Sequence, residues 1–358
     1  MNLFIKGYEG GSRLASVRLD GDIAILGDDG CAVRLDSVQS PGKLSTGDIL
    51  TIDRQGRGYR LYSNEEHDAT VFMTGRCNSN CIMCPTSDRE RQIDSGLPDA
   101  KLLSYIDMLP ADVSHVVVTG GEPTLRPGLF LKVMKKLTDR FPHIETLLLT
   151  NGRSLSVSSF FDRLRSYCPP YLCVAIPLHG DTPELHDRIT RAPGSFVQTD
   201  KGIRNLLAAG IAVEIRIVVT KLNEDVLKRI ADRIIRYYPT VYTVNFIGLE
   251  TRGNCAKNFR EVYIGHRQAF EAMKDAIDAL VGAGINTSIY NFPLCDVDAG
   301  YWGICRKSIS PEKVRFPAAC DACAAKAECG GFFSTTLSMT KPHVKPILPI
   351  MAREEAGA

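Results

Sequence analysis

The segment that decides the fold is Met73-Thr-Gly-Arg-Cys77-Asn-Ser-Asn-Cys81-Ile-Met-Cys84-Pro85. Its three cysteines come directly after a strand-like run at 70–74, and their spacing is C-x3-C-x2-C. Barrel-like α/β proteins carry their chemistry on the loops at the carboxyl ends of their strands. Three thiolates so close together can hold three irons of a [4Fe–4S] cluster and leave the fourth iron open to an outside ligand.

Two simpler interpretations of these cysteines compete with the cluster. One is a structural zinc site, which would need a fourth Cys or His nearby, whereas the nearest histidines are His67 and His115. The other is a set of unconnected thiols, but with 12 cysteines in 358 residues this spacing arises by chance in roughly one such chain per hundred. We therefore favour the iron–sulfur cluster.

The sequence around this loop predicts an α/β fold. Strand-like segments alternate with amphipathic helical patterns from about residue 69, which is typical of βα units on a parallel sheet. The candidate strands are 70–74, 115–119, 146–150, 171–177, 212–220 and 241–248. Six βα units are fewer than the eight of a closed barrel, so we expect a partial (β/α)6 barrel with a wide lateral mouth. A helix near 263–282 should bury Phe270, Met273, Ile277 and Leu280.

Two smaller regions flank the predicted barrel at 67–290. Residues 1–66 contain short strand-like runs separated by Gly and Asp turns, which predicts a small all-β domain. The predicted strands there are 15–19, 23–26, 32–35, 49–52 and 58–62. Residues 291–358 form a Cys-rich extension, and the Pro-rich tail from Lys341 is expected to be poorly ordered.

Composition limits the classes of function. Lys and Arg number 43 against 41 Asp and Glu, and the net charge of +2 argues against a nucleic-acid partner. No apolar run is long enough for a membrane span, and the N-terminus lacks the pattern of a signal peptide, so we expect no membrane association and a cytoplasmic location. In that reducing compartment the cysteines favour metal or redox chemistry over disulfides.

The position and spacing of Cys77, Cys81 and Cys84 resemble the radical S-adenosylmethionine (SAM) superfamily. The resemblance implies that the amino and carboxylate groups of SAM occupy the open iron. The residue before the last cysteine is often aromatic in that family and lies near adenine. Here it is Met83, whose adaptable thioether can take that place.

A second motif, Gly120-Gly121-Glu122-Pro123, ends the second predicted strand. Glycines there let the backbone approach a ligand closely, and a glutamate can accept hydrogen bonds from an ammonium group. Taken alone, these residues could form an ordinary turn. Because the motif ends the strand that follows the cysteine loop, it resembles the site that binds the SAM amino group in the radical SAM family.

The next two strands end in segments that contain Asn151 and His179, and the strand after them carries Arg216. The same resemblance places these positions near the SAM ribose, the SAM carboxylate and the edge of the substrate. The simpler alternatives are that Asn151-Gly152 is a turn and that His179 caps a loop. His179 could also handle a proton or contact substrate.

A second cysteine group lies near the C-terminus. Its run C-x2-C-x5-C resembles the auxiliary-cluster extensions of radical SAM peptide-modifying enzymes, with Phe333 where a further cysteine would complete the longer pattern. We expect one auxiliary [4Fe–4S] cluster. With four protein ligands it would be structural or electron-transferring, and with one ligand missing its open iron could bind substrate. The predicted ligands are Cys295, Cys320, Cys323 and Cys329, with Cys305 as the competing fourth ligand. A structural zinc held by the same thiolates is the alternative.

The whole chain resembles the radical SAM maturases of His-Xaa-Ser peptide systems. The residues that carry this likeness are the cysteine loop, Ile247-Gly-Leu-Glu250, Gly253, Ser308-Ile-Ser310 and Cys329-Gly-Gly-Phe-Phe333. The resemblance implies a ribosomally made precursor peptide as substrate, a second radical SAM partner and a reducing electron donor. The alternatives are a radical SAM enzyme for a small molecule or folded protein, and a non-enzymatic iron–sulfur or zinc protein.

Overall fold

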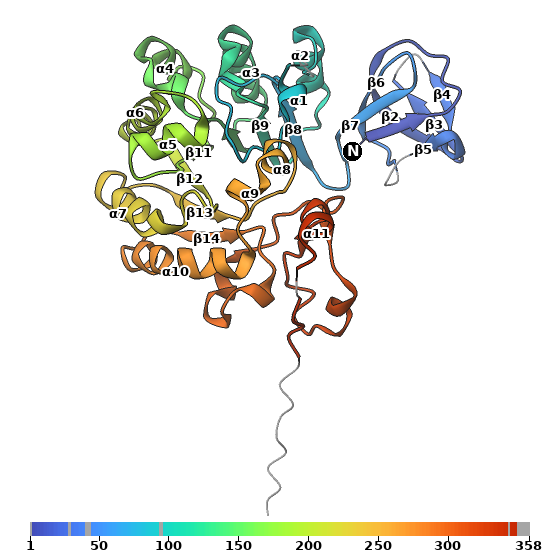
Figure 1. Cartoon of the computed structure of the whole chain (residues 1–358). Coiled ribbons are helices and arrows are strands. Elements are labelled where there is room, and N and C mark those ends of the chain that lie inside the picture. The colour runs from blue at the N-terminus through green and yellow to red at the C-terminus, as the bar shows by residue number, and fades with distance from the viewer. Residues whose placement is uncertain (1, 28–29, 40–43, 93–95, 343, 349–358) are drawn as a thin grey trace, which may run out of the picture. The chain divides into compact units, whose positions relative to one another are not determined.

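The computed structural model describes residues 2–27, 30–39, 44–92, 96–342 and 344–348 (Figure 1). The chain divides into two compact units, each assembled from separate stretches of sequence. The first unit is Met1–Asn78, Arg89–Ile176 and Val197–Val213, and the second is Ser79–Asp88, Pro177–Phe196 and Glu214–Ala358. No helix among the described residues is long and apolar enough to cross a membrane.

The first unit opens with antiparallel strands that have their own hydrophobic core. The strands are β1 (Asn2–Ile5), β2 (Arg13–Asp20), β3 (Ile23–Leu26), β4 (Cys31–Arg34), β5 (Val38–Gln39), β6 (Ile49–Ile52) and β7 (Arg57–Tyr62). Leu3, Val17, Leu26 and Leu50 are among the side chains buried between them. All five predicted strands are present. Strand β1 and the two-residue β5 were not among the predicted strands.

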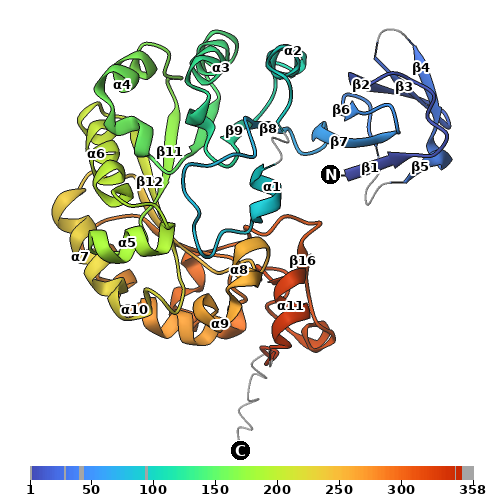
Figure 2. The same cartoon turned by 45° about the horizontal axis from the view of Figure 1, so that its top comes forward.

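Four parallel strands complete the sheet of this unit. They are β8 (Asp68–Phe72), β9 (His115–Thr119), β10 (Glu145–Leu149) and β11 (Leu172–Pro177), and they lie side by side in that order. Helices α2 (Asp99–Met108), α3 (Pro127–Arg140) and α4 (Ser158–Arg165) lie on one face of these strands (Figure 2). Val71, Val116, Leu148 and Val174 are fully buried, as expected for strands covered on both faces.

The second unit also contains parallel strands. They are β12 (Ala212–Val218), β13 (Thr243–Ile247), β14 (Thr287–Tyr290) and β15 (Cys305–Arg306). The six predicted strands correspond to β8–β13, and the short β14 and β15 extend the parallel order beyond them. The helices are α5 (Pro183–Thr190), α6 (Ser195–Ala208, shared with the first unit), α7 (Leu227–Tyr237), α8 (Gly253–Lys257), α9 (Phe259–Val262) and α10 (His266–Gly282). Helix α10 buries Phe270, Met273, Ile277 and Leu280, which confirms the predicted pattern.

The C-terminal extension is built from short elements. They are η5 (Leu294–Asp296), η6 (Ala299–Ile304), β16 (Val314–Arg315), η7 (Ala318–Ala322), β17 (Phe332–Phe333) and α11 (Ser334–Thr340). The expectation of a poorly ordered tail from Lys341 is wrong for part of it, since the backbone N–H of Ala324 donates to the carbonyl of Ile347 at 2.8 Å. Proline content suggested disorder, but it gave no sign of this contact with the cysteine region. Residues 349–358 lie outside the described residues.

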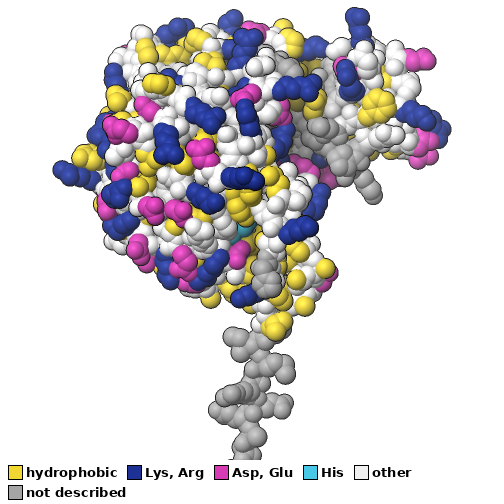
Figure 3. Space-filling model, viewed as in Figure 1, with side chains coloured by type: hydrophobic (Ala, Val, Ile, Leu, Met, Phe, Trp, Pro, Cys, Tyr) yellow, Lys and Arg dark blue, Asp and Glu magenta, His cyan; other side chains and the backbone are white. Residues whose placement is uncertain are grey.

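Charged side chains of both signs are interspersed over the face of the molecule seen in Figure 3. No block of a single sign is visible on that face, in keeping with the net charge of +2.

Candidate cofactor sites

In the first unit, the Gly-Gly-Glu motif lies directly against the loop that carries Cys77. The backbone N–H of Gly121 donates to the carbonyl of Thr74, and that of Glu122 donates to the carbonyl of Arg76, each at 2.8 Å. Two backbone hydrogen bonds therefore join the end of β9 to the loop that follows β8. The register of the neighbouring strands, Phe72 opposite Thr119, brings these two loops together.

The glycines of this motif are required by that contact. A Cβ at Gly120 would lie 2.5 Å from the carbonyl oxygen of Thr74, and one at Gly121 would lie 2.2 Å from that of Arg76. Side-chain carbons do not approach backbone oxygens so closely, so any larger residue would push the cysteine loop away. The sequence predicted that these glycines let the backbone approach a ligand closely. In the structure they let it approach the backbone of the cysteine loop.

Glu122 is completely buried, and its carboxylate accepts four hydrogen bonds. The donors are the Thr124 backbone N–H at 3.1 Å, the Thr124 hydroxyl at 2.6 Å, the Thr150 hydroxyl at 2.7 Å and the Asn151 backbone N–H at 2.7 Å. A carboxylate has about four acceptor positions. In this structure Glu122 therefore fixes the end of β10, whereas the sequence suggested a direct contact with the SAM ammonium group.

Asn151 connects the end of β10 to the first cysteine. Its side-chain amide donates to Oδ1 of Asn78 at 2.6 Å, and Nδ2 lies 4.0 Å from Sγ of Cys77. Arg153 also donates to the backbone carbonyl of Asn78, at 2.5 Å. The structure thus brings together Cys77, Glu122 and Asn151, three residues predicted from separate strand ends.

In the second unit, the segment with Cys81 and Cys84 is held by helix α8 and the turn after it. The Asn254 side chain is buried, and its amide donates to Oδ1 of Asn80 at 2.8 Å and to the Cys81 carbonyl at 3.2 Å. The Asn254 backbone N–H donates to the Cys84 carbonyl at 2.9 Å. Asn258 adds a bond from Nδ2 to the carbonyl of Ile82 at 3.0 Å.

Gly253, which begins α8, is a close-contact glycine like Gly120 and Gly121. Its φ is +57°, and a Cβ there would lie 2.3 Å from the carbonyl oxygen of Pro85. From the sequence, Gly253 was identified only as one of the residues that carry the likeness to the His-Xaa-Ser maturases, with no structural role assigned to it. Its role and that of Asn254 were missed, because nothing in the sequence links positions 254 and 81.

The remaining predicted SAM-side residues belong to the second unit. Met83 is 5% exposed, and Arg216 pairs with Glu214 through Nε and Oε1 at 2.5 Å. His179 is 2% exposed and stacks on His186, with ring centroids 5.7 Å apart. Burial, together with the neighbouring His186, lowers the pKa of His179 to about 3. His179 is therefore a neutral, packed side chain at pH 7, which suits the core better than proton transfer.

The second cysteine group lines a single pocket of the second unit. This pocket encloses about 300 Å³ of space, part of it open to solvent, and the cysteines that line it are Cys295, Cys320, Cys323 and Cys329. Cys305 is not among the lining residues, and its thiol donates to the carbonyl of Tyr301 at 3.6 Å. Across the described ranges, no three His, Cys, Asp or Glu side chains stand in the geometry of a bound metal.

Backbone N–H groups surround the sulfurs of this pocket. Those of Leu294 and Gly331 each donate to Sγ of Cys329 at 3.4 Å, and that of Ile347 donates to Sγ of Cys323 at 3.4 Å. Such donors are typical partners of metal-bound thiolates, which carry negative charge. Burial, with repulsion from Asp296 and neighbouring thiols, raises the pKa of Cys295 to about 12, so only a bound cation would hold this thiol deprotonated at pH 7.

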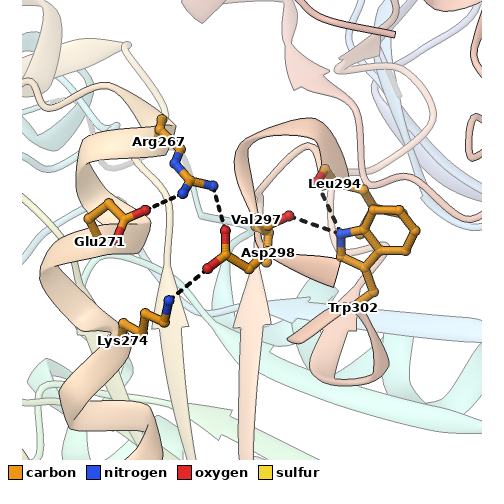
Figure 4. A network of polar contacts seen from close by, with 7 residues as sticks. All are labelled: Arg267, Glu271, Lys274, Leu294, Val297, Asp298 and Trp302. Atoms are coloured by element: carbon orange, nitrogen blue, oxygen red, sulfur yellow. Dashed lines mark hydrogen bonds and ion pairs between the residues drawn. The ribbon is translucent and has the colours of Figure 1, made fainter. Parts of the chain in front are cut away.

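The segment that carries Cys295 is anchored on both sides (Figure 4). Asp298 accepts hydrogen bonds from Lys274 at 2.7 Å and from Arg267 at 2.8 Å, both on helix α10. These two cations lower the pKa of Asp298. Trp302 donates from Nε1 to the carbonyls of Leu294 and Val297, at 3.1 and 3.0 Å. The loop is therefore preorganised around the cysteine.

One stretch of the chain matches a family model. Residues 71–234, a little under half of the chain, match the model of the radical SAM superfamily. The matched region contains the cysteine loop, the Gly-Gly-Glu motif and Asn151, so the resemblance inferred from these residues is confirmed.

Among individual proteins, the chain is similar to mycofactocin maturases and to an AdoMet-dependent heme synthase. It is 34% identical over 175 residues to the mycofactocin maturase MftC of Mycobacterium tuberculosis, an alignment that covers 48% of this chain and 42% of the relative. With MftC of Mycobacterium ulcerans it shares 33% identity over 191 residues, or 51% and 49% of the two chains. An AdoMet-dependent heme synthase of Methanosarcina barkeri is 27% identical over 183 residues, or 51% of each. The chain thus spans about half the length of the curated relatives it matches.

Solved structures support the fold. SuiB of Streptococcus suis bound to its precursor peptide SuiA superposes with a TM-score of 0.50 at 15% identity, over 63% of this chain and 50% of SuiB. SuiB bound to S-adenosylmethionine gives the same score and identity over 62% and 50%. At this level of identity the likeness concerns the α/β fold alone.

Proposed function

We propose that this chain is a radical SAM enzyme that modifies a ribosomally made precursor peptide. The observation that carries the proposal is the bonded arrangement of the cysteine loop, Glu122 and Asn151 at adjoining strand ends. A [4Fe–4S] cluster held by Cys77, Cys81 and Cys84 would, with one electron from a reductant, supply the chemistry that splits SAM into methionine and a 5′-deoxyadenosyl radical able to take a hydrogen atom from the substrate. The donor chemistry of the C-x3-C-x2-C segment suits such a cluster.

In this proposal each residue of the chain has a separate task. Cys77, Cys81 and Cys84 hold the cluster, and Gly120, Gly121 and Pro123 keep the backbone of the neighbouring loop close to it. Glu122 orients Asn151 from its buried position. Met83, Asn151 and Arg216 are then the residues proposed to lie beside the bound SAM or the substrate, whereas the packed His179 supports the core of its unit. The protein's contribution is to orient the reacting atoms and exclude water.

The auxiliary pocket is proposed to hold a second [4Fe–4S] cluster on its four thiols. Four protein ligands would leave no open iron, so this centre would relay electrons or brace the fold. Zinc on the same thiolates is the competing occupant, because all-cysteine zinc sites are common. Support for Cys295 over Cys305 as the fourth ligand comes from the pocket, which Cys295 lines and Cys305 does not.

Two similarities favour a peptide substrate. The relatives named mycofactocin maturase are similar to half of this chain, and SuiB, which shares the fold, was crystallised with its precursor peptide. The likeness to His-Xaa-Ser maturases narrows the proposal to a His-Xaa-Ser repeat peptide. It also suggests a second radical SAM partner and a reducing electron donor.

The deciding experiment is anaerobic purification followed by two measurements. Iron and sulfide analysis should find clusters, and reduction in the presence of SAM should release methionine and 5′-deoxyadenosine. Intact-mass spectrometry of a co-expressed His-Xaa-Ser repeat peptide should then show a changed mass. Zinc without sulfide, or no SAM cleavage after reduction, would refute the radical proposal. An unchanged peptide mass alongside active SAM cleavage would refute only the peptide substrate.

Cysteine variants separate the two centres. Cys81→Ala should abolish reductive SAM cleavage, whereas Cys323→Ala should lower the iron content and retain some cleavage. Cys31→Ala is the matched control, because Cys31 is a partly exposed cysteine on β4 in the N-terminal strands. Equal losses in all three variants would point to a general folding defect and contradict these assignments.

A second candidate function is supported by the relatives named AdoMet-dependent heme synthase, one of which is 27% identical over 51% of this chain. It would make the substrate a porphyrin rather than a peptide. Incubating the reduced enzyme with SAM and an iron porphyrin, and following the porphyrin mass, tests this candidate. A porphyrin product without any peptide product would favour it.

A further inference from the structure

We propose that residues Val344–Ile347, here called the tail strap, form part of the auxiliary metal centre, with the Ile347 backbone N–H as a positioning donor to Cys323. The inference rests on the proposed function only in requiring a metal on the four pocket thiols. It adds the part of the chain that closes and tunes this centre. The sequence suggested no role for these residues.

The tail strap is joined to the cysteine region by two backbone bonds on one residue. The N–H of Ile347 donates to Sγ of Cys323 at 3.4 Å, and its carbonyl accepts from the N–H of Ala324 at 2.8 Å. Because both bonds involve consecutive residues of the metal loop, they fix the register of the strap against it. All four strap residues line the pocket together with the cysteines.

The charge distribution of the pocket explains why such donors matter. Four thiolates around one metal centre concentrate negative charge in a largely buried place, and N–H donors offset it. The loop itself supplies donors to Cys329, from Leu294 and Gly331. For Cys323 the donor is Ile347, and the backbone of Lys345 also hydrogen-bonds Cys295. The strap therefore supports two of the four sulfurs.

A pair of substitutions at one position isolates the hydrogen bond. Ile347→Pro removes the N–H and leaves the carbonyl, whereas Ile347→Ala keeps the N–H and trims the side chain. Both are made in a background with Cys77, Cys81 and Cys84 changed to Ala, so that all bound metal belongs to the auxiliary pocket. Metal release is followed with bathophenanthroline for iron and zincon for zinc.

Ile347→Pro should weaken metal retention by about 10–100-fold, the usual effect of losing a partner of a metal ligand, while Ile347→Ala stays near the parent. If the metal is a [4Fe–4S] cluster, redox titration followed by electron paramagnetic resonance should show a more negative reduction potential in Ile347→Pro. The direction follows because an N–H donor stabilises the reduced, more negative cluster more than the oxidised one. A merely structural role of the strap would not shift the potential.

A matched pair of truncations guards against misfolding of the proline variant. A chain ending at Leu348 keeps the strap, and a chain ending at Thr340 lacks it. The first should retain metal like the parent, and the second should lose it as Ile347→Pro does, with circular dichroism unchanged in both.

The outcomes separate the strap from the centre itself. Equal metal retention and equal potential in the parent, Ile347→Pro and the chain ending at Thr340 would overturn the strap inference while leaving the auxiliary centre standing. If the parent background binds neither iron nor zinc, the auxiliary centre fails and the strap inference fails with it. The radical SAM centre is untouched by either result.

Discussion

Glu122 is completely buried in the turn that follows strand β9. The Glu122 carboxylate accepts hydrogen bonds from Thr124, Thr150 and the backbone N–H of Asn151. Three of these bonds go to Oε1 and one to Oε2. The side chain therefore acts through Asn151, whose amide reaches toward Cys77.

Glu122→Gln should weaken SAM binding without removing the cluster. An amide keeps one acceptor oxygen but turns the other group into a donor, which then faces the N–H of Asn151. Leaving a buried donor unsatisfied costs about 1–3 kcal/mol, or about 5- to 150-fold in affinity if all of it falls on the bound state.

The measurement is SAM affinity by equilibrium dialysis on the reconstituted protein, with iron content as a check. Glu145→Gln is the matched control, because Glu145 is an exposed residue of β10. Unchanged affinity in Glu122→Gln would mean that the position of Asn151 does not depend on this carboxylate.

His179 predicts a pH dependence of stability. Its folded pKa of about 3 lies below the ordinary value of 6.5, so the unfolded chain binds a proton that the folded chain rejects. Above pH 6.5 the ring is neutral in both the folded and the unfolded chain, so it does not change the free energy of unfolding. As the pH falls from 6.5 toward 3, only the unfolded chain takes up the proton, and the free energy of unfolding decreases. At pH 5 the loss from one such group is about 2 kcal/mol.

His179→Gln should therefore show a smaller drop in melting temperature between pH 7 and pH 5 than the parent. His143→Gln, which changes an exposed histidine, serves as the control and should keep the parental difference. An identical pH dependence in all three proteins would contradict the burial argument.

At the scale of elements, the five-residue helix α8 holds the backbone of the segment that carries Cys81 and Cys84. Its first two residues, Gly253 and Asn254, contact the backbone on both sides of Cys84. So short a helix is not stable by propensity, and its tertiary contacts define it. Because these contacts are made with the cysteine segment, a shift of α8 would also shift that segment.

Gly253→Ala should lower the iron content of the radical SAM site. The added Cβ would lie 2.3 Å from the carbonyl of Pro85, and φ is +57°, so the turn must shift at a cost of about 1–3 kcal/mol. Iron per chain and melting temperature are the measurements. Gly282→Ala, at the end of α10 where a Cβ meets open space, should leave both unchanged, and a similar loss there would undermine the interpretation.

At the scale of the whole molecule, the N-terminal strands have a core of their own. Leu3, Val17, Leu26 and Leu50 belong to one buried cluster, and β7 joins β8 through the single register pair Tyr62 and Ala69. A region of this size can fold alone when its core is complete, although it is close to the lower limit.

Residues 1–63 expressed alone should therefore fold as a β protein. Dispersed amide signals in a ¹⁵N–¹H spectrum and a cooperative thermal transition are the expected results. A fragment with Val17→Asp, which puts a charge into the core, is the negative control and should be unfolded. A random-coil spectrum for the parent fragment would show that the strands need the rest of the first unit.

The sequence predicted those parts of the molecule that depend on local pattern. The strands β8–β13, the helix at 263–282 and the position of the Gly-Gly-Glu motif after a strand all follow from periodicity and turn chemistry. The family follows from the spacing of three cysteines, confirmed over residues 71–234.

Contacts between distant positions could not be predicted in this way. Asn254 lies 173 residues from the Cys81 carbonyl that it binds, and Ile347 lies 24 residues from the Cys323 sulfur. The hydrogen bond between Glu122 and Thr150 was missed for the same reason, because the two residues are 28 positions apart. A single sequence records residue types, and these bonds depend on three-dimensional proximity.

Trp302 is the only tryptophan of the chain, and its indole bonds to both ends of the segment that carries Cys295. The ultraviolet emission of the whole protein therefore comes chiefly from one place beside the auxiliary pocket. Loading or loss of a coloured iron–sulfur centre there would quench or restore this light without any attached dye. The emission of Trp302 would therefore report directly on the occupancy of the proposed auxiliary centre.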